Sequence, residues 1–184
     1  LSQLMAQKNS MLADVTHDLR TPLTNIKMQL EALEDGALEH SEKSYNSLQK
    51  KLGNLNQMVG DLYHLSLVES GSLVLNKQAV LIESIVNESI ESFQPLANKV
   101  GLSIVYYGFK EEEITVNADA GRLLQVFNNL LKNSIRYTDP NGEINVSLSV
   151  DALEVTITFE DTSPGVIDKD LAHLFNRLYR AETT

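Results

Sequence analysis

Two stretches in the first 70 residues carry apolar side chains that recur at alternating spacings of three and four residues. The first comprises Leu12, Val15, Leu19, Pro22 and Ile26, and the second Tyr45, Leu48, Leu52, Leu55, Val59 and Leu62. This spacing is typical of the seam along which helices pack in coiled coils and helix bundles. Between the two stretches, Gly36 is a candidate helix stop and Ser41 a candidate N-cap, so the pattern predicts a helical hairpin. Two amphipathic helices alone bury little surface, and we therefore expect two copies to close into a dimeric four-helix bundle.

The stretch ESGSL at residues 69–73 ends this pattern and predicts a domain boundary, with a helical hairpin at 1–70 and a second domain at 71–184. Short strands are expected at 73–80, 102–107 and 114–118, with a helix at 81–98. Asp119 can cap a further helix that runs to about Tyr137 and is followed by a turn at TDPNG.

The clearest strand signal lies at 143–150 and 153–160, where apolar and polar residues alternate. The apolar members are Ile144, Val146, Leu148 and Val150, then Leu153, Val155, Ile157 and Phe159. This pair predicts an antiparallel hairpin with one apolar face. Helices must cover that face, so the expected fold class is α+β, a helical hairpin followed by an α/β sandwich.

The composition argues against several classes of function. The 184 residues carry a formal net charge of -10, which argues against nucleic acid as the main ligand because phosphate backbones attract Lys and Arg. Cysteine is absent, so neither a disulfide framework nor a thiolate metal site is expected. No apolar run approaches the ~20 residues that a membrane helix needs. The chain opens within a helical pattern and without an initiator Met, and we interpret it as a fragment, with room for a membrane anchor upstream.

Residues 16–23, THDLRTPL, place a histidine, an acid and a proline close together in the first predicted helix. In the heptad of the first seam His17 falls at f, the position farthest from the core. Asp18 can accept a hydrogen bond from the imidazole, and Thr21 lies one turn on. Pro22 cannot donate to the Asp18 carbonyl and its ring crowds that group, which weakens the helix at His17. The stretch therefore suits a nucleophilic histidine with an acid beside it, and the alternative is a solvated surface histidine.

The predicted helix after Asp119 contains the amide-rich run NNLLKNSIRYT. Asn129 and Asn133 share a face, with Gln125 one turn before them and Arg136 close to the stripe. The apolar residues Leu123, Phe127, Leu130 and Leu131 are expected to point towards the sheet. Neutral amide oxygens suit Mg²⁺ that is shared with phosphate, and a neighbouring cation suits phosphate itself. The alternative is an amphipathic helix whose wet face is rich in amides.

The stretch DTSPGV at residues 161–166 follows directly on the last predicted strand. Asp161 is a candidate ligand-binding carboxylate, and Gly165 would allow the backbone to approach a ligand closely. The alternative is a plain Pro-Gly turn with a capping aspartate.

THDLRTPL resembles the H-box of bacterial two-component sensor histidine kinases, which is usually written SHELRTPL. The resemblance implies that His17 accepts the γ-phosphoryl group of ATP and passes it to an aspartate on the receiver domain of a response regulator. It also implies that Asp18 is the acid/base and that Thr21 positions water in a reverse phosphatase reaction. The family forms homodimers through its helical hairpin, as the apolar seams here predict.

FNNLLKNSIRYT resembles the N-box of the same kinases and of the wider Bergerat-type ATPases. By this resemblance Asn133 holds Mg²⁺ with support from Asn129, Arg136 approaches phosphate, and Tyr137 packs near the adenine. The family more often has Lys at the position of Arg136, and Arg is not a neutral replacement for Lys. Chaperone and topoisomerase ATPases share the N-box but lack an H-box, which disfavours that alternative.

DTSPGV resembles the G1 box, usually DxGxG, and LFNRLYRAE resembles the F-box, usually near IFERFYRA. The resemblance implies that Asp161 accepts a hydrogen bond from the adenine amino group and that Gly165 lets the backbone approach the nucleotide. Ser163 stands where the first glycine of the box is expected. Phe175 and Tyr179 are expected to pack the base of a lid.

The family then has a glycine-rich G2 box, and none of the nine glycines of this sequence forms such a loop. The resemblance therefore implies an incomplete ATP-binding domain, for which we expect weak ATP binding and little autophosphorylation. The alternative function is a dimeric module that docks a response regulator with little or no ATP binding. The motifs together are similar to those of envelope-stress sensor kinases, which implies the cytoplasmic part of a bacterial inner-membrane sensor.

Overall fold

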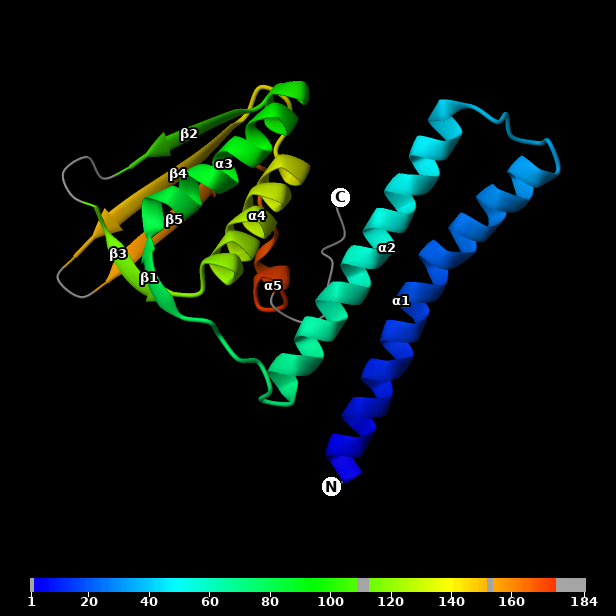
Figure 1. Cartoon of the computed structure of the whole chain (residues 1–184), viewed down its shortest axis with the longest axis horizontal. Helices are drawn as coiled ribbons and strands as arrows, with labels where there is room; N and C mark the ends of the chain where they lie inside the picture. Colours follow the sequence, from blue (N-terminus) through cyan, green and yellow to red (C-terminus); the bar gives the residue numbers. More distant parts are fainter. Residues whose placement is uncertain (1, 109–112, 152–153, 175–184) are drawn as a thin grey trace. The chain divides into compact units, whose positions relative to one another are not determined.

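The computed structural model describes residues 2–108, 113–151 and 154–174. For residues 2–15, and for His17, Asp18 and Asp168, it describes the backbone alone. The chain divides into two compact units, Leu1–Val74 and Leu75–Thr184, which are described separately (Figure 1).

The first unit is a hairpin of two long helices, α1 (Ser2–Glu34) and α2 (Glu42–Glu69). Gly36 adopts a φ of 70° just after α1, a conformation that glycine reaches at little cost. Ser41 is the N-cap of α2, because its side chain accepts a hydrogen bond from the backbone N–H of Ser44. The predicted helix stop and N-cap are thus both confirmed. Pro22 lies inside α1, which continues through it as a helix.

The contact between α1 and α2 buries both apolar and polar groups. Ile26 and Leu33 of α1 are buried, and so is Gln29, which lies between them in the sequence. Gln29 Nε2 donates to the carbonyl of Ser44 at 3.1 Å, and Lys51 Nζ donates to Gln29 Oε1 at 2.6 Å. A buried amide needs such partners, because an unsatisfied polar group inside a protein is costly.

The second unit contains two small sheets. Strand β1 (Gln78–Leu81) pairs antiparallel with β3 (Thr115–Ala118). Strand β4 (Glu143–Val150) lies in the centre of the other sheet, parallel to β2 (Ser103–Tyr107) and antiparallel to β5 (Val155–Asp161). The antiparallel hairpin predicted from the alternating pattern is therefore present, and the sheet as a whole is mixed.

Helices α3 (Ile82–Lys99) and α4 (Ala120–Tyr137) cover one face of the three-stranded sheet (Figure 1). The core between helices and sheet is built from α3, α4 and the inward side chains of β4, namely Val86, Ala97, Phe127, Leu131, Ile144, Val146 and Leu148. The α+β fold class predicted from the sequence is confirmed. A short helix, α5 (Asp168–Leu171), follows β5.

Two local expectations are corrected. The strand expected at 73–80 begins only at Gln78, because Val74 is 88% exposed and the backbone N–H of Asn76 binds the Asp119 carboxylate instead of a neighbouring strand. Val150 is 39% exposed, because it lies at the turn end of the β4–β5 hairpin, where it pairs with Val155, at the opposite end of β4 from the buried Ile144.

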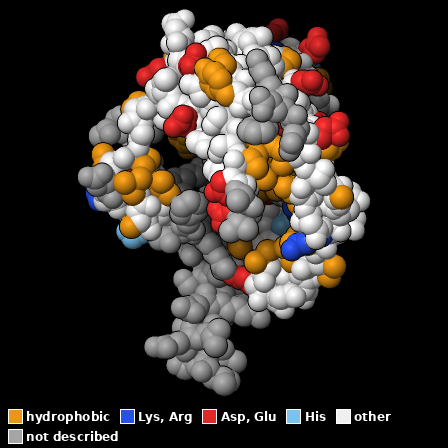
Figure 2. Space-filling view, turned by 90° about the vertical axis from the view of Figure 1, so that its left-hand side faces the viewer, with side chains coloured by type: hydrophobic (Ala, Val, Ile, Leu, Met, Phe, Trp, Pro, Cys, Tyr) orange, Lys and Arg blue, Asp and Glu red, His pale blue; other side chains and the backbone are white. Residues whose placement is uncertain are grey.

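Among the described residues, no helix is both long and apolar enough to cross a membrane. Figure 2 shows scattered acidic side chains and fewer Lys or Arg side chains on the face that it draws, in line with the net charge of -10.

Candidate functional site

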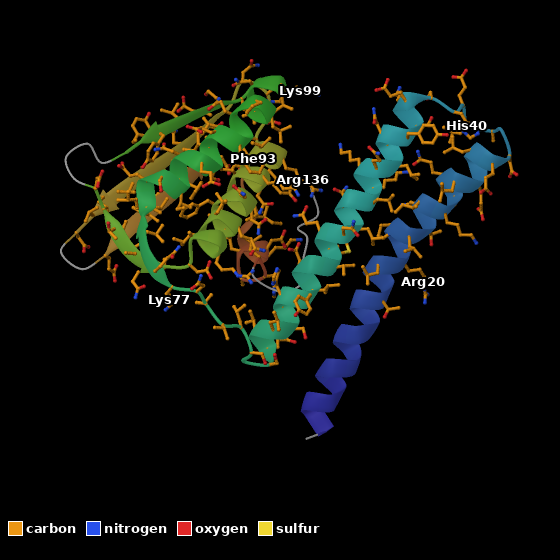
Figure 3. The ribbon with its side chains drawn as sticks, in the orientation of Figure 1. Arg20, His40, Lys77, Phe93, Lys99 and Arg136 are labelled. Atoms are coloured by element: carbon orange, nitrogen blue, oxygen red, sulfur yellow. The ribbon has the colours of Figure 1, made fainter. Side chains whose placement is uncertain are left out.

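The H-box stretch lies within α1, in the first unit. His17 and Asp18 are part of the continuous helix, although their side chains lie outside the described part of the chain. Thr21 is exposed and Pro22 is half-buried. Arg20, three residues after His17, is exposed and points away from α2 (Figure 3). The backbone therefore presents this stretch on the long α1 helix of the hairpin.

Helix α4 carries the predicted amide stripe on its outer side. Asn129, Asn133 and Arg136 are exposed, and Tyr137 is 47% exposed. The Arg136 guanidinium lies 5.3 Å from the centroid of the Tyr137 ring and covers one of its faces. The four side chains to which the resemblance assigns nucleotide contacts are thus all accessible from solvent.

The inner side of α4 differs in one position from expectation. Phe127 and Leu131 are buried, as predicted, but Leu130 is 40% exposed and does not reach the sheet core. Its position one residue before Leu131 turns it by about 100° around the helix axis, away from the core. Gln125 is half-buried and accepts a hydrogen bond from Arg122.

Asn128, which the sequence analysis passed over, joins α4 to α3. Its Oδ1 accepts a hydrogen bond from the Ser89 hydroxyl at 2.7 Å, and Ser89 is only 1% exposed. The available signal was the serine itself, because Ser89 interrupts the apolar stripe of α3, where a polar side chain needs a buried partner.

Asp161 is the last residue of β5, and its carboxylate accepts hydrogen bonds from neighbouring residues. Its Oδ1 accepts the backbone N–H of Ser163 at 3.2 Å, and its side chain also receives hydrogen bonds from the hydroxyls of Ser134 and Ser163. Burial would raise the pKa of Asp161, but these hydrogen bonds outweigh burial and lower the pKa below its usual value. The carboxylate is therefore held in its charged, accepting form.

Ser134 directly follows Asn133 on α4 and is 6% exposed. Its hydroxyl helps to lower the pKa of Asp161, and α4 packs against β5, so the amide stripe and the carboxylate belong to one part of the second unit. The sequence pattern did not single out Ser134. Its partner Asp161 lies two strands further along the chain, and nothing local to a serine after an asparagine indicates such a distant partner.

Gly165 has a φ of +74°, and a side chain added there would meet nothing within 4 Å. The residue is thus required by backbone conformation and not by close packing. Phe175 and Tyr179, which were expected to pack a lid, lie outside the described residues.

The donor chemistry of this corner suits a magnesium nucleotide. Asn129 and Asn133 offer neutral amide oxygens one turn apart, and Mg²⁺ accepts one or two such ligands when phosphate oxygens and water complete its shell. Within the described ranges no group of three or more His, Cys, Asp or Glu side chains forms a metal cluster, so no metal site made only of such protein ligands is seen there.

Comparison with known families gives matches to both parts of the chain. Residues 7–71 match the His Kinase A (phospho-acceptor) domain, and residues 118–184 match the histidine kinase-, DNA gyrase B- and HSP90-like ATPase domain. The chain belongs to the histidine kinase family. The histidine kinase BaeS of Escherichia coli (strain K12) is 36% identical over 182 residues, which are 99% of this chain and 38% of that protein. The motifs of this chain already suggested a likeness to BaeS, and the match confirms it.

The sensor protein SphS of Synechococcus elongatus is 34% identical over 99% of this chain and 44% of its own length. The chain thus spans less than half the length of these two curated relatives. Among solved structures, the Acinetobacter baumannii histidine kinase AdeS superposes with a TM-score of 0.78 at 29% identity, over 87% of this chain and 78% of that one. The histidine kinase ThkA, solved in complex with the response regulator protein TrrA, shares the fold with a TM-score of 0.76 at 20% identity, over 93% of this chain and 50% of that one.

Proposed function

We propose that this chain transfers the γ-phosphoryl group of ATP to His17 and from there to an aspartate on a response regulator. The observation that carries the proposal is the presence, on one chain, of a phosphoacceptor hairpin that contains His17 and an ATPase-type unit that contains the bound Asp161 carboxylate. The relatives are named a signal transduction histidine-protein kinase and a sensor protein, which supports a role in signalling, and we place this chain in the cytoplasmic part of a bacterial inner-membrane sensor.

On the nucleotide side, Asp161 is proposed to accept a hydrogen bond from the adenine amino group, with Gly165 allowing close approach of the backbone. Tyr137 packs near the base, Arg136 contacts phosphate, and Asn133, supported by Asn129, holds Mg²⁺. The exposure of the four α4 side chains and the charged state of Asp161 support these roles. The ion would neutralise phosphate charge, and the protein side chains would mainly position the nucleotide for phosphoryl transfer.

On the histidine side, an imidazole nitrogen of His17 attacks the γ-phosphorus, the bond between that phosphorus and the β,γ-bridging oxygen breaks, and ADP leaves. Asp18 takes the ring proton, and Thr21 positions water when the phosphoryl group of the regulator is hydrolysed in the reverse direction. The position of all three residues on α1 supports the proposal, since an ordered helix presents them together.

The hairpin is proposed to dimerise, because half of its apolar seam is left uncovered. Tyr45, Leu52 and Val59 recur every seven residues along α2 and are 42–50% exposed, whereas Leu48, Leu55 and Leu62 between them are half-buried. Leu23 and Leu30 form a similar exposed pair on α1. A second copy that covers both sets would complete a four-helix bundle.

The test is labelling of the chain with γ-labelled ATP and Mg²⁺, alone and beside a complete kinase subunit in which the histidine equivalent to His17 is replaced by Gln. Acid-labile label on His17 is expected, lost in H17Q and kept in the control H40Q, since His40 lies exposed in the loop after α1 (Figure 3). Label only beside the complete subunit would confirm His17 as the acceptor and show that this chain lacks its own kinase step. No label in either mixture would contradict the proposal. It would favour the alternative function, in which the chain is a dimeric module that docks a response regulator.

A further inference from the structure

The stretch of chain that joins the two units is held at both of its ends by hydrogen bonds. At the end of α2, Gly71 has a φ of 66° and donates its backbone N–H to the Val68 carbonyl at 3.1 Å. The backbone N–H groups of Ser72 and Leu73 both donate to the Leu67 carbonyl, at 2.9 and 3.1 Å. The bonds of Gly71 and Ser72 form the Schellman motif that ends many helices. The chain is therefore fixed to α2 as far as Leu73.

The second anchor is the side chain of Asp119. Its Oδ2 accepts the backbone N–H of Asn76 at 2.9 Å. Asp119 directly follows the last pair of the β1–β3 ladder, Gln78 with Ala118, and α4 begins at the next residue. The ladder cannot continue where the chain turns into a helix, so the carboxylate takes the place of a strand acceptor. Asn76 is thus fixed to the second unit two residues before β1 begins.

The Asp119 carboxylate is itself held in position by α4. Its other oxygen, Oδ1, accepts the backbone N–H of Arg122 at 3.1 Å as the N-cap of the helix. Hydrogen bonds to an ionised acceptor are stronger than neutral ones. Because each oxygen binds one N–H group, the carboxylate cannot turn away from Asn76 without disturbing the cap. Asp119 therefore ties Asn76 to the first turn of α4.

Only Val74 and Leu75 lie between the two anchors. Within the described part of the chain, neither residue takes part in a hydrogen bond. Val74 is 88% exposed and Leu75 is 42% exposed, so packing also restrains them little. The boundary between the two compact units falls between these same two residues. Each of them keeps two soft backbone dihedrals.

We propose that Val74 and Leu75 form a two-residue hinge between the units, and that Asp119 is the positioning residue that sets the far end of this hinge. Without the Asp119 carboxylate, the free stretch would extend towards the start of β1 at Gln78, from two residues to as many as four. Each added residue contributes two more soft dihedrals, which widens the range of orientations open to the second unit.

The inference goes beyond the proposed function and holds whether or not the chain transfers phosphate. In the proposed reaction, the nucleotide-binding side chains and His17 belong to different units. The length of the hinge would then limit the ways in which the nucleotide can approach the histidine.

The first test is limited digestion with trypsin at Lys77, an exposed residue just before β1 (Figure 3). An amide has one acceptor oxygen, so D119N can cap α4 but cannot bind Asn76 as well. N76P removes the N–H donor itself. Both variants are expected to be cut after Lys77 about three- to tenfold faster than the unmodified chain, the effect of losing one hydrogen bond. N76A keeps the N–H and is the matched control, with an expected rate equal to that of the unmodified chain.

Two further comparisons isolate the anchor. Each rate is divided by that of a synthetic peptide of residues 70–82 with the same substitution, so that the preference of trypsin itself cancels. Cleavage after Lys99 at the end of α3 is expected to be equal in all variants, since the second unit stays folded (Figure 3). The double variant D119N/N76P is expected to be cut no faster after Lys77 than N76P, because both changes remove the same bond. Equal rates after Lys77 in N76A, N76P and D119N, or effects that multiply in the double variant, would overturn the anchor.

A second experiment measures the hinge directly. The sequence has no cysteine, so K50C in α2 and E91C in α3 place one spin label on each unit at exposed positions. Pulsed electron paramagnetic resonance then gives the distribution of distances between the labels, with excess unlabelled chain present so that pairs within one chain dominate. D119N and N76P are expected to broaden this distribution and N76A to leave it unchanged. Equal widths in all variants, even with faster cleavage after Lys77, would overturn the role of Asp119 in the hinge.

Discussion

Gly142 lies in the turn between α4 and β4, directly beside the threonines that flank the Asp161 corner. A methyl group added there would meet the Thr138 side chain, lie 2.5 Å from Thr162 Oγ1, and lie 2.9 Å from the carbonyl oxygen of Asp139. The Thr138 side chain is 8% exposed, so little room exists for it to move. Thr162 is equally constrained, because its hydroxyl accepts the backbone N–H of Glu143 at 3.0 Å.

The substitution G142A is therefore expected to destabilise the second unit by about 1–3 kcal/mol, the usual cost of overpacking. Chemical denaturation followed by circular dichroism measures this free energy of unfolding. The matched control is G121A in the first turn of α4, where the nearest atom to an added methyl lies at 3.5 Å and alanine favours the helix. If G142A were as stable as the unmodified chain, the side chains of Thr138 and Thr162 would be able to move aside at little cost.

At the residue scale, the sequence predicts which side chains carry the chemistry but not what holds them. Asp161 and Asn133 stand out because they close or interrupt regular patterns. Ser134 does not, since its contact with Asp161 depends on how α4 packs against β5, and neither spacing nor propensity along the chain encodes that pairing.

At the element scale, Gln29 is the polar link that sets how α1 lies on α2. It is 9% exposed, donates to the Ser44 carbonyl, and accepts from Lys51. Q29A is expected to cost about 1–3 kcal/mol of hairpin stability, because the Ser44 carbonyl and the Lys51 ammonium both lose a partner. Urea denaturation measures the loss, with Q49A on the exposed side of α2 as the control. Similar midpoints for Q29A and Q49A would contradict a role in helix pairing.

Helix α4 depends on Asp119 at its first turn. The pKa of Asp119 is lowered, first by the hydrogen bond from the Arg122 backbone N–H and then by that from Asn76, so one carboxylate caps the helix and anchors the incoming chain. A carboxyl with a lowered folded pKa contributes stability that is present above its unfolded pKa and is lost as the pH falls through the folded value.

D119A is thus expected to lower the thermal midpoint of the second unit at pH 7, and the gap to the unmodified chain is expected to narrow as the pH falls below about 4. Thermal scans followed by circular dichroism across this pH range measure both effects. E91A, which removes an exposed carboxylate of α3, is the control. A gap that stays constant with pH would mean that the charge of Asp119 does not contribute.

The elements themselves follow closely from local sequence. Helix ends are marked by the capping side chains of Ser41 and Asp119 and by the positive φ of Gly36. The alternation at 143–150 determines which face of β4 is buried. The parallel pairing of β2 with β4 was not predicted, because β3 and the whole of α4 lie between these two strands along the chain. A pairing across such a separation depends on how the helices pack, and the intervening pattern does not specify the partner strand.

At the scale of the whole molecule, the two units differ in how completely they bury their own apolar side chains. The second unit closes its own core between two helices and a sheet, whereas the hairpin leaves Leu52 and Val59 exposed at heptad spacing. An apolar seam of this kind in a helix pair is satisfied only by further helices.

V59E is accordingly expected to weaken self-association of the chain, because a charge would enter the apolar seam of the proposed bundle, and to raise the dimer dissociation constant by about tenfold or more. Sedimentation equilibrium or light scattering at several concentrations measures this constant. N54E adds the same charge at an exposed polar position of α2 that lies about 140° around the helix from Val59, away from the seam, and serves as the control. Because Val59 is 50% exposed within the hairpin, the helices are expected to persist in V59E, so that helical content by circular dichroism stays constant while mass falls. A monomer at all concentrations for the unmodified chain would contradict the four-helix bundle, and equal dimerisation of V59E and N54E would place the interface on another face of the hairpin.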